Sequence, residues 1–308
     1  MRSTPLLDVR RAKVRTQRIN GGGDSSSFLN EGQSGEEEDS LKKWNMAAGF
    51  LHAASGIAAL VMTLVYLSGS FMTEITTNFR VYEANATGPV SAGPFASGLR
   101  SLGYYRLVWV DLPFPFITAF FHLAIAFLPA VNTYYNDAVF RGGERSGNPL
   151  RWLEYSITAS LMIWVIMQLS GVTDLFTLLF LGVMCNVALQ WMGYIQEQLK
   201  GRSVAPTVVG WLIFAGQWAV VFSYFFTAIT SPRPMDVERV PWFVYSIVLG
   251  LFFLFSLFGA VQLSHLLEWP RFMAKPHNVE KAYIFLSFTA KLFLTWNLLI
   301  GMAINPMV

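Results

Sequence analysis

The stretch AYIFLSFTAKLFLTWNLLIGMA, residues 282–303, is almost entirely apolar and has one charged side chain, Lys291, near its middle. A helix rises about 1.5 Å per residue, so a run of this length crosses the roughly 30 Å of hydrocarbon in a bilayer. Six further apolar runs precede it, at 46–70, 107–131, 152–172, 175–196, 208–230 and 241–267. The sequence therefore predicts an all-α membrane protein built as a bundle of seven transmembrane helices.

The composition agrees with a membrane protein and excludes several other classes. Of the 308 residues, 54% are hydrophobic and 13% are charged, against about 25% charged in soluble domains. The net charge of +3 comes from bases in short connections between apolar runs, which indicates membrane topology and no nucleic-acid partner. The single cysteine, Cys185, excludes an internal disulfide and a cysteine-based metal site held by this chain alone.

Two segments outside the apolar runs have a distinct character. Residues 1–41 are poor in apolar side chains and end in an acidic run, so we expect a disordered cytoplasmic tail before a bundle domain at 42–308. An organelle transit peptide in the Arg-rich first 18 residues is the alternative. The first two runs are joined by about 36 residues rich in Gly-Pro pairs, a length that predicts a loop with structure of its own. Only Thr173 and Asp174 separate the third and fourth runs, so these two helices must be antiparallel neighbours, with Asp174 as the helix cap.

The distribution of basic residues predicts the orientation. Counting only bases near the spans, about 10 lie on the side of the N-terminus and about 5 on the other side, which places the N-terminus in the cytoplasm and the C-terminus outside. The glycosylation sequon at Asn85 falls in the long loop that this orientation places outside.

Lys291 and Glu154 are the ionisable residues that most need an explanation. A charge at mid-bilayer costs roughly 2.5 to 3.5 kcal/mol even on insertion scales, so it indicates a function. Both helices run outward, and helical side chains lean toward the helix N-terminus, so Lys291 can reach the level of Glu154. One interpretation is a structural ion pair. The other is a lysine that forms an imine with an aldehyde, with the carboxylate as its counterion, which is the arrangement of retinal proteins.

Other polar residues in the spans extend this hypothesis. His52 and His122 fall at one depth in the cytoplasmic half and form either packing contacts or a proton-accepting cluster. Thr118 lies one helical turn from His122. Ser287 lies one turn from Lys291. Between Lys291 and the outer surface, the spans contain Gln168 and Asn297 but no carboxylate at mid-depth, which argues against a pump.

We assign no chemical role to the other polar and aromatic residues considered. Trp296 lies about 140° around the helix from Lys291 and need not share its face. Asn186 and Gln190 share a helix face and suit interhelical hydrogen bonds. No phosphate-binding loop, metal motif or catalytic triad occurs in a credible context, so we predict no enzyme activity and no metal site. The residues left at span ends or in loops are Asp111, Glu197, His265, Glu268 and His277.

Four motifs occur in order along the predicted bundle: WLEYS at 152–156, FVY at 243–245, AVQ at 260–262 and EKAYI at 280–284. Together with Ser287 and Lys291 they closely resemble the heliorhodopsins, over about 45–296. The resemblance implies a rhodopsin-like bundle with an N-terminus in the cytoplasm and a short β-hairpin in the first extracellular loop. It implies all-trans retinal on Lys291, and Glu154 as counterion. The other positions that it places near the retinal are His52, His122, Thr118, Ser287, Met162, Asn186 and Trp296.

The sequence thus predicts a light-sensing retinal protein in which isomerisation on Lys291 drives loss of the imine proton and a conformational signal. A light-gated or light-driven proton conductor is the alternative, and a retinal-free transporter or receptor is a third. The resemblance implies a homodimer. We expect contact with membrane lipids and a cytoplasmic signalling partner, and a place in the plasma membrane or, as the alternative, an organelle membrane.

Overall fold

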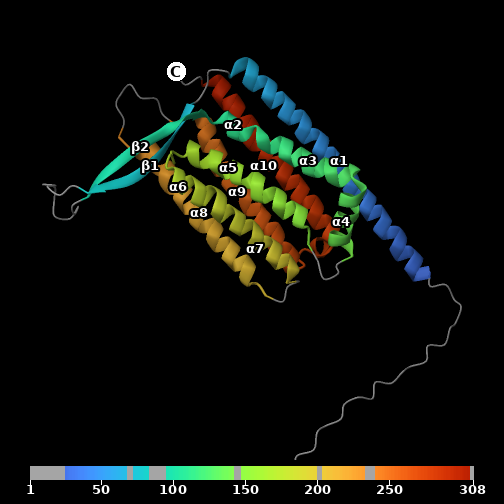
Figure 1. The fold of residues 1–308 in the computed structure, drawn as a ribbon. Helices are drawn as coiled ribbons and strands as arrows, with labels where there is room; N and C mark the ends of the chain where they lie inside the picture. The colour runs from blue at the N-terminus through green and yellow to red at the C-terminus, as the bar shows by residue number, and fades with distance from the viewer. Residues whose placement is uncertain are drawn as a thin grey trace, which may run out of the picture.

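The computed structural model describes residues 25–67, 72–82, 95–141, 147–199, 203–232 and 240–305. These contain seven helical spans that are long and apolar enough to cross a membrane, as predicted. They pack as a bundle with a two-stranded hairpin projecting from one end, which we call the hairpin end (Figure 1). The spans are α1 (Ser25–Tyr66), α2 with α3 (Val108–Asp111, Pro113–Phe127), α5 (Pro149–Leu169), α6 with η2 and α7 (Leu175–Thr177, Leu178–Cys185, Asn186–Gln198), α8 (Ala205–Thr230), α9 (Trp242–Leu266) and α10 (Pro276–Ile304).

Helix α1 begins much earlier than the sequence predicts. The structure describes it from Ser25, so the expected disordered tail is wrong for 25–41, while 1–24 lie outside the described residues. The reason is contact with the bundle. Leu41 is fully buried against Tyr135 and its neighbours, and Glu38 accepts a hydrogen bond from Asn136. These contacts offset the entropy that a polar segment loses on ordering.

The second span is shorter than predicted. It was expected to continue to residue 131, but α3 ends at Phe127 and a separate helix, α4 (Pro129–Phe140), follows. Leu128 is extended, with φ −91° and ψ 111°, because the ring of Pro129 disfavours helical backbone at the preceding residue. Helix α4 therefore lies at the end of the bundle opposite the hairpin (Figure 1).

The long first loop forms the expected hairpin. Strand β1 (Met72–Tyr82) pairs antiparallel with β2 (Phe95–Arg106), and a register shift between Ile75 and Thr76 leaves Leu102 of β2 without a partner residue. The sequon at Asn85 lies outside the described residues.

The hairpin rests on the tight turn between α5 and α6. Asp174 caps α6 by accepting the N–H of Thr177, as predicted, and also accepts the N–H of Asn78 in β1. Burial raises the pKa of Asp174, but these hydrogen bonds outweigh it and hold the pKa below its ordinary value. The turn thus ties the hairpin to two antiparallel helices. The π-helix η2 that follows α6 had no predicted counterpart.

Candidate functional site

Lys291 and Glu154 meet in the centre of the bundle. Nζ of Lys291 lies 2.6 Å from Oε1 of Glu154 and 2.7 Å from Oγ of Ser287. Both charged side chains are buried. The pairing of α10 with α5 that the depth argument predicts is confirmed, and Ser287 lies on the lysine's face as its spacing indicated.

Two threonines hold the carboxylate in place. Thr118 of α3 donates its hydroxyl to Oε1 of Glu154 at 2.6 Å, and Thr158, one turn further along α5, donates to the same oxygen at 2.9 Å. The predicted Thr118 is therefore a partner of Glu154. Thr158 was missed, although its i+4 spacing from Glu154 was a usable signal.

The two histidines stack beside this pair. The rings of His52 and His122 are parallel within 3°, and their centroids lie 6.1 Å apart. Nδ1 of His122 lies 2.7 Å from Oδ1 of Asn45, a residue that the sequence analysis did not single out. Nε2 of His52 has no hydrogen-bond partner among the described residues. The predicted common depth of the two histidines is confirmed.

Lys291 also opens onto a cavity between α5, α7, α8, α9 and α10. The cavity contains about 940 Å³ of empty space, open solvent at its mouth included. Met162 and Asn186 line it, as the resemblance implied. Its aromatic walls include Tyr155, Trp211, Phe214, Phe255 and Phe258.

Of the positions that the resemblance places near the retinal, four do not line this cavity: His52, His122, Thr118 and Trp296. The indole N–H of Trp296 donates to Oγ of Ser55 in α1 at 3.1 Å. The correction agrees with the helix geometry, which puts Trp296 about 140° away from Lys291.

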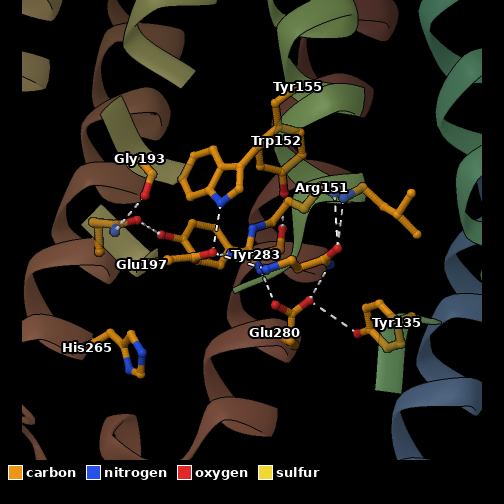
Figure 2. Close-up of polar contacts among 12 residues, drawn as sticks. Tyr135, Arg151, Trp152, Tyr155, Gly193, Glu197, His265, Glu280 and Tyr283 are labelled. Carbon is orange, nitrogen blue, oxygen red and sulfur yellow. Dashed lines mark hydrogen bonds and ion pairs between the residues drawn. The ribbon is translucent and has the colours of Figure 1, made fainter. Parts of the chain in front are cut away.

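A second polar cluster joins three helix ends opposite the hairpin. Arg151 forms ion pairs with Glu197 of α7 and Glu280 of α10, and all three side chains are buried. Figure 2 shows Arg151 between the two carboxylates, with the indole of Trp152 directed at Glu197 and the Tyr135 hydroxyl directed at Glu280. The sequence analysis missed this cluster, because residues at span ends were assumed to be solvated.

Tyr135, in α4 outside the spans, serves this cluster as a hydrogen-bond donor. Its hydroxyl lies 3.2 Å from Oε2 of Glu280. Burial and the neighbouring Glu280 carboxylate raise the pKa of Tyr135 well above its ordinary value, so the phenol keeps its proton.

A smaller cavity lies between the Lys291 site and the Arg151 cluster. Its walls include His122 and Glu154 at one end, and Glu280, Arg151 and Tyr135 at the other. One cavity therefore borders both the Lys291 site and the Arg151 cluster, on the side of the bundle away from the hairpin. No group of three or more metal-ligating side chains occurs in the described part of the chain.

Seven apolar helices around a buried lysine–carboxylate pair define a rhodopsin-type membrane protein. A sequence model of the heliorhodopsin family matches residues 41–303, so the chain belongs to the heliorhodopsin family. It is a retinal-binding, light-responsive protein that crosses the membrane several times. The resemblance drawn from the motifs is confirmed.

Solved structures agree on the fold. The transmembrane domain of the Salpingoeca rosetta rhodopsin phosphodiesterase matches with a TM-score of 0.57 and 14% identity, covering 90% of this chain and 88% of that one. The same transmembrane domain with its linker region matches with a TM-score of 0.55 and 13% identity, covering 86% and 71%. At such identities the likeness shows the fold alone. No curated protein matches the chain.

The residues present fit a retinal. A buried primary amine stands in the wall of a cavity lined with aromatic and aliphatic side chains, which suits an apolar polyene aldehyde. A carboxylate within 2.6 Å of the amine supplies the negative charge that a protonated imine needs.

Proposed function

We propose that this chain is a light sensor, with all-trans retinal attached to Lys291. The observation that carries the proposal is the buried Lys291 amine, which lines the apolar cavity and is hydrogen-bonded to Glu154. Retinal supplies light absorption and isomerisation of a double bond. The chain's own residues set the charge and the proton position around that group.

Glu154 balances the positive charge on Nζ of Lys291. Hydrogen bonds from Thr118 and Thr158 stabilise its ionised form. At 2.6 Å, Oε1 is also close enough to accept the proton of Nζ. From there the smaller cavity offers His122 and Asn45 as the next polar groups. A proton that leaves Nζ therefore stays within the bundle, on the side away from the hairpin.

Replacing Glu154 with Gln tests the counterion role. The amide keeps the shape but removes the negative charge, so the imine on Lys291 should lose its proton at lower pH than in the wild type and the absorption maximum should move. The measurement is a pH titration of the visible spectrum. Glu197→Gln changes a carboxylate whose side chain is 7% exposed and that lies outside the cavity wall, and it is the control that should leave the maximum in place. An unchanged titration and maximum in Glu154→Gln would assign the counterion to another group.

A cavity with polar walls extends from the Lys291 site in one direction only among the described residues, which favours a sensor over a conductor. Among the described residues, the smaller cavity leads from Glu154 toward Glu280 and away from the hairpin end. Toward the hairpin, Gln168 is held by the hydroxyl of Thr73, and Asn297 is held by Ser246. Asp111 also lies on that side, but it lines neither of the two cavities.

Light should therefore drive no steady proton current. Under voltage clamp, cells that express the chain with retinal should give at most a transient signal, and illumination should cause no sustained pH change that an uncoupler abolishes. Lys291→Ala is the matched dark control. A steady, retinal-dependent photocurrent that reverses with the proton gradient would select the conductor instead.

The proposal also covers the orientation of the chain in the membrane, its oligomeric state and its signalling partner. The N-terminus faces the cytoplasm and the hairpin faces outward, as the basic residues near the spans indicate. The hairpin bears exposed apolar side chains, including Leu99 and Tyr104, which supports a homodimer formed through it. A plasma-membrane sensor of this form passes its signal to a cytoplasmic partner.

A further inference from the structure

Asp111 is a buried acid that the functional site leaves unexplained. It ends helix α2 and has no exposed surface. Neither of its carboxyl oxygens has a hydrogen-bond partner in the described part of the chain. The hydroxyl of Thr295 in α10 interacts with this carboxyl. It is likewise buried and makes no hydrogen bond of standard geometry in the described part of the chain. The expectation that Asp111 is a solvated residue at a span end is wrong.

Along the helix axes, Asp111 lies on the hairpin side of Lys291, whereas Ser287 lies on the other side. Thr295 is one turn after Lys291 on the same helix face, whereas Ser287 is one turn before it. In the antiparallel α2–α3 span, Asp111 precedes Thr118, the partner of Glu154, by seven residues, or about 10 Å toward the hairpin. The sequence predicts no carboxylate at mid-depth on this side, and Asp111 lies nearer the end of its span, as the fourth residue of α2.

A buried carboxyl in this setting needs either a proton or a cation. The ion pairs between described residues include none to Asp111. Burying an isolated carboxylate is strongly unfavourable, and buried polar atoms without a protein partner commonly bind ordered water. The neutral acid, in contrast, has an O–H to donate, and Thr295 offers an oxygen to accept it.

We propose that Asp111 and Thr295 form a second proton-binding site, in which Asp111 keeps its proton in the dark and donates it in a hydrogen bond to Thr295 directly or through one buried water. Light displaces α10 at Lys291, and Thr295 moves with it because it is on the same helix. The hydrogen bond of Asp111 then changes while its proton stays in place. The pair thereby links the lysine site to the helix that begins at the hairpin. The light-dependent part rests on the proposed sensor function.

Infrared spectroscopy of the purified full chain in the dark tests the proton, with or without retinal. Wild type should show a carbonyl-stretch band of a protonated carboxylic acid that Asp111→Asn removes. Asp174→Asn, which alters a hydrogen-bonded carboxylate at the same end of the bundle, should leave that band unchanged. Thr295→Val should shift the band without removing it. An identical band in wild type and Asp111→Asn would overturn the proposal, and if Asp111→Asn does not fold, an unshifted band in Thr295→Val does so.

Light-minus-dark difference spectra of the retinal-loaded chain test the coupling. A paired positive and negative band in the same carbonyl region should appear in the wild type, shift in Thr295→Val and be missing in Asp111→Asn. If the chain takes up retinal and responds to light but this pair persists in Asp111→Asn, the coupling fails and the sensor proposal stands. If the chain with retinal stays colourless, the proposed function fails, while the dark spectra still decide whether Asp111 holds a proton.

Discussion

Replacing Lys291 with Ala is expected to abolish visible absorption of the retinal-loaded chain. Among the described residues, Lys291 is the one lysine that is buried, and its amine lines the apolar cavity. Only an unprotonated amine can form an imine, and a lysine in a desolvated site is suited to that reaction. The measurement is the absorption spectrum of protein expressed with all-trans retinal.

A second lysine of the same helix provides the control. Lys281 lies ten residues before Lys291 in α10 and is partly exposed, so Lys281→Ala should keep the full colour. Circular dichroism should give equal helix content for both variants, which separates loss of attachment from loss of fold. Colour at full intensity in Lys291→Ala would refute retinal attachment at this residue.

The Lys291–Glu154 pair could be predicted because the bilayer makes intramembrane charge expensive. Few such residues occur in the seven spans, and the lean of helical side chains fixes which of them can meet. Helix geometry alone also placed Trp296 correctly, away from the lysine's face. The pocket role implied for Trp296 by the family resemblance is the part that the structure corrects, since its indole binds Ser55.

The Arg151 cluster shows what the sequence leaves open. Its members come from the ends of α5, α7 and α10, and their convergence depends on how three helices pack. At a span end, the cost of burying a charge depends on whether neighbouring segments cover it, which hydropathy does not record. Asp111 escaped prediction for the same reason. In both cases burial decided the outcome, and burial is a property of the packed bundle.

Replacing Arg151 with Ala is expected to be the most destabilising of these substitutions. It leaves Glu197 and Glu280 buried without their shared cation, and removal of one partner from a buried ion pair costs about 3–5 kcal/mol. Arg151→Lys should recover only part of this loss, because a single ammonium cannot reproduce the two-sided contact of a guanidinium. The measurement is the free energy of unfolding, followed by denaturant-induced loss of helical signal in one detergent.

An exposed ion pair of the same chain provides a reference for the loss of unfolding free energy in Arg151→Ala. Arg141 pairs with Asp137 at i,i+4 on the surface of α4, where such pairs contribute about 0.3–0.5 kcal/mol. Arg141→Ala should therefore cost far less than Arg151→Ala. Neutralising both carboxylates in an Arg151→Met background, with Glu197→Gln and Glu280→Gln, should restore much of the stability, because no unpaired charge then remains buried. Equal, small losses in Arg151→Ala and Arg141→Ala would mean that water reaches the cluster and that its charges are solvated.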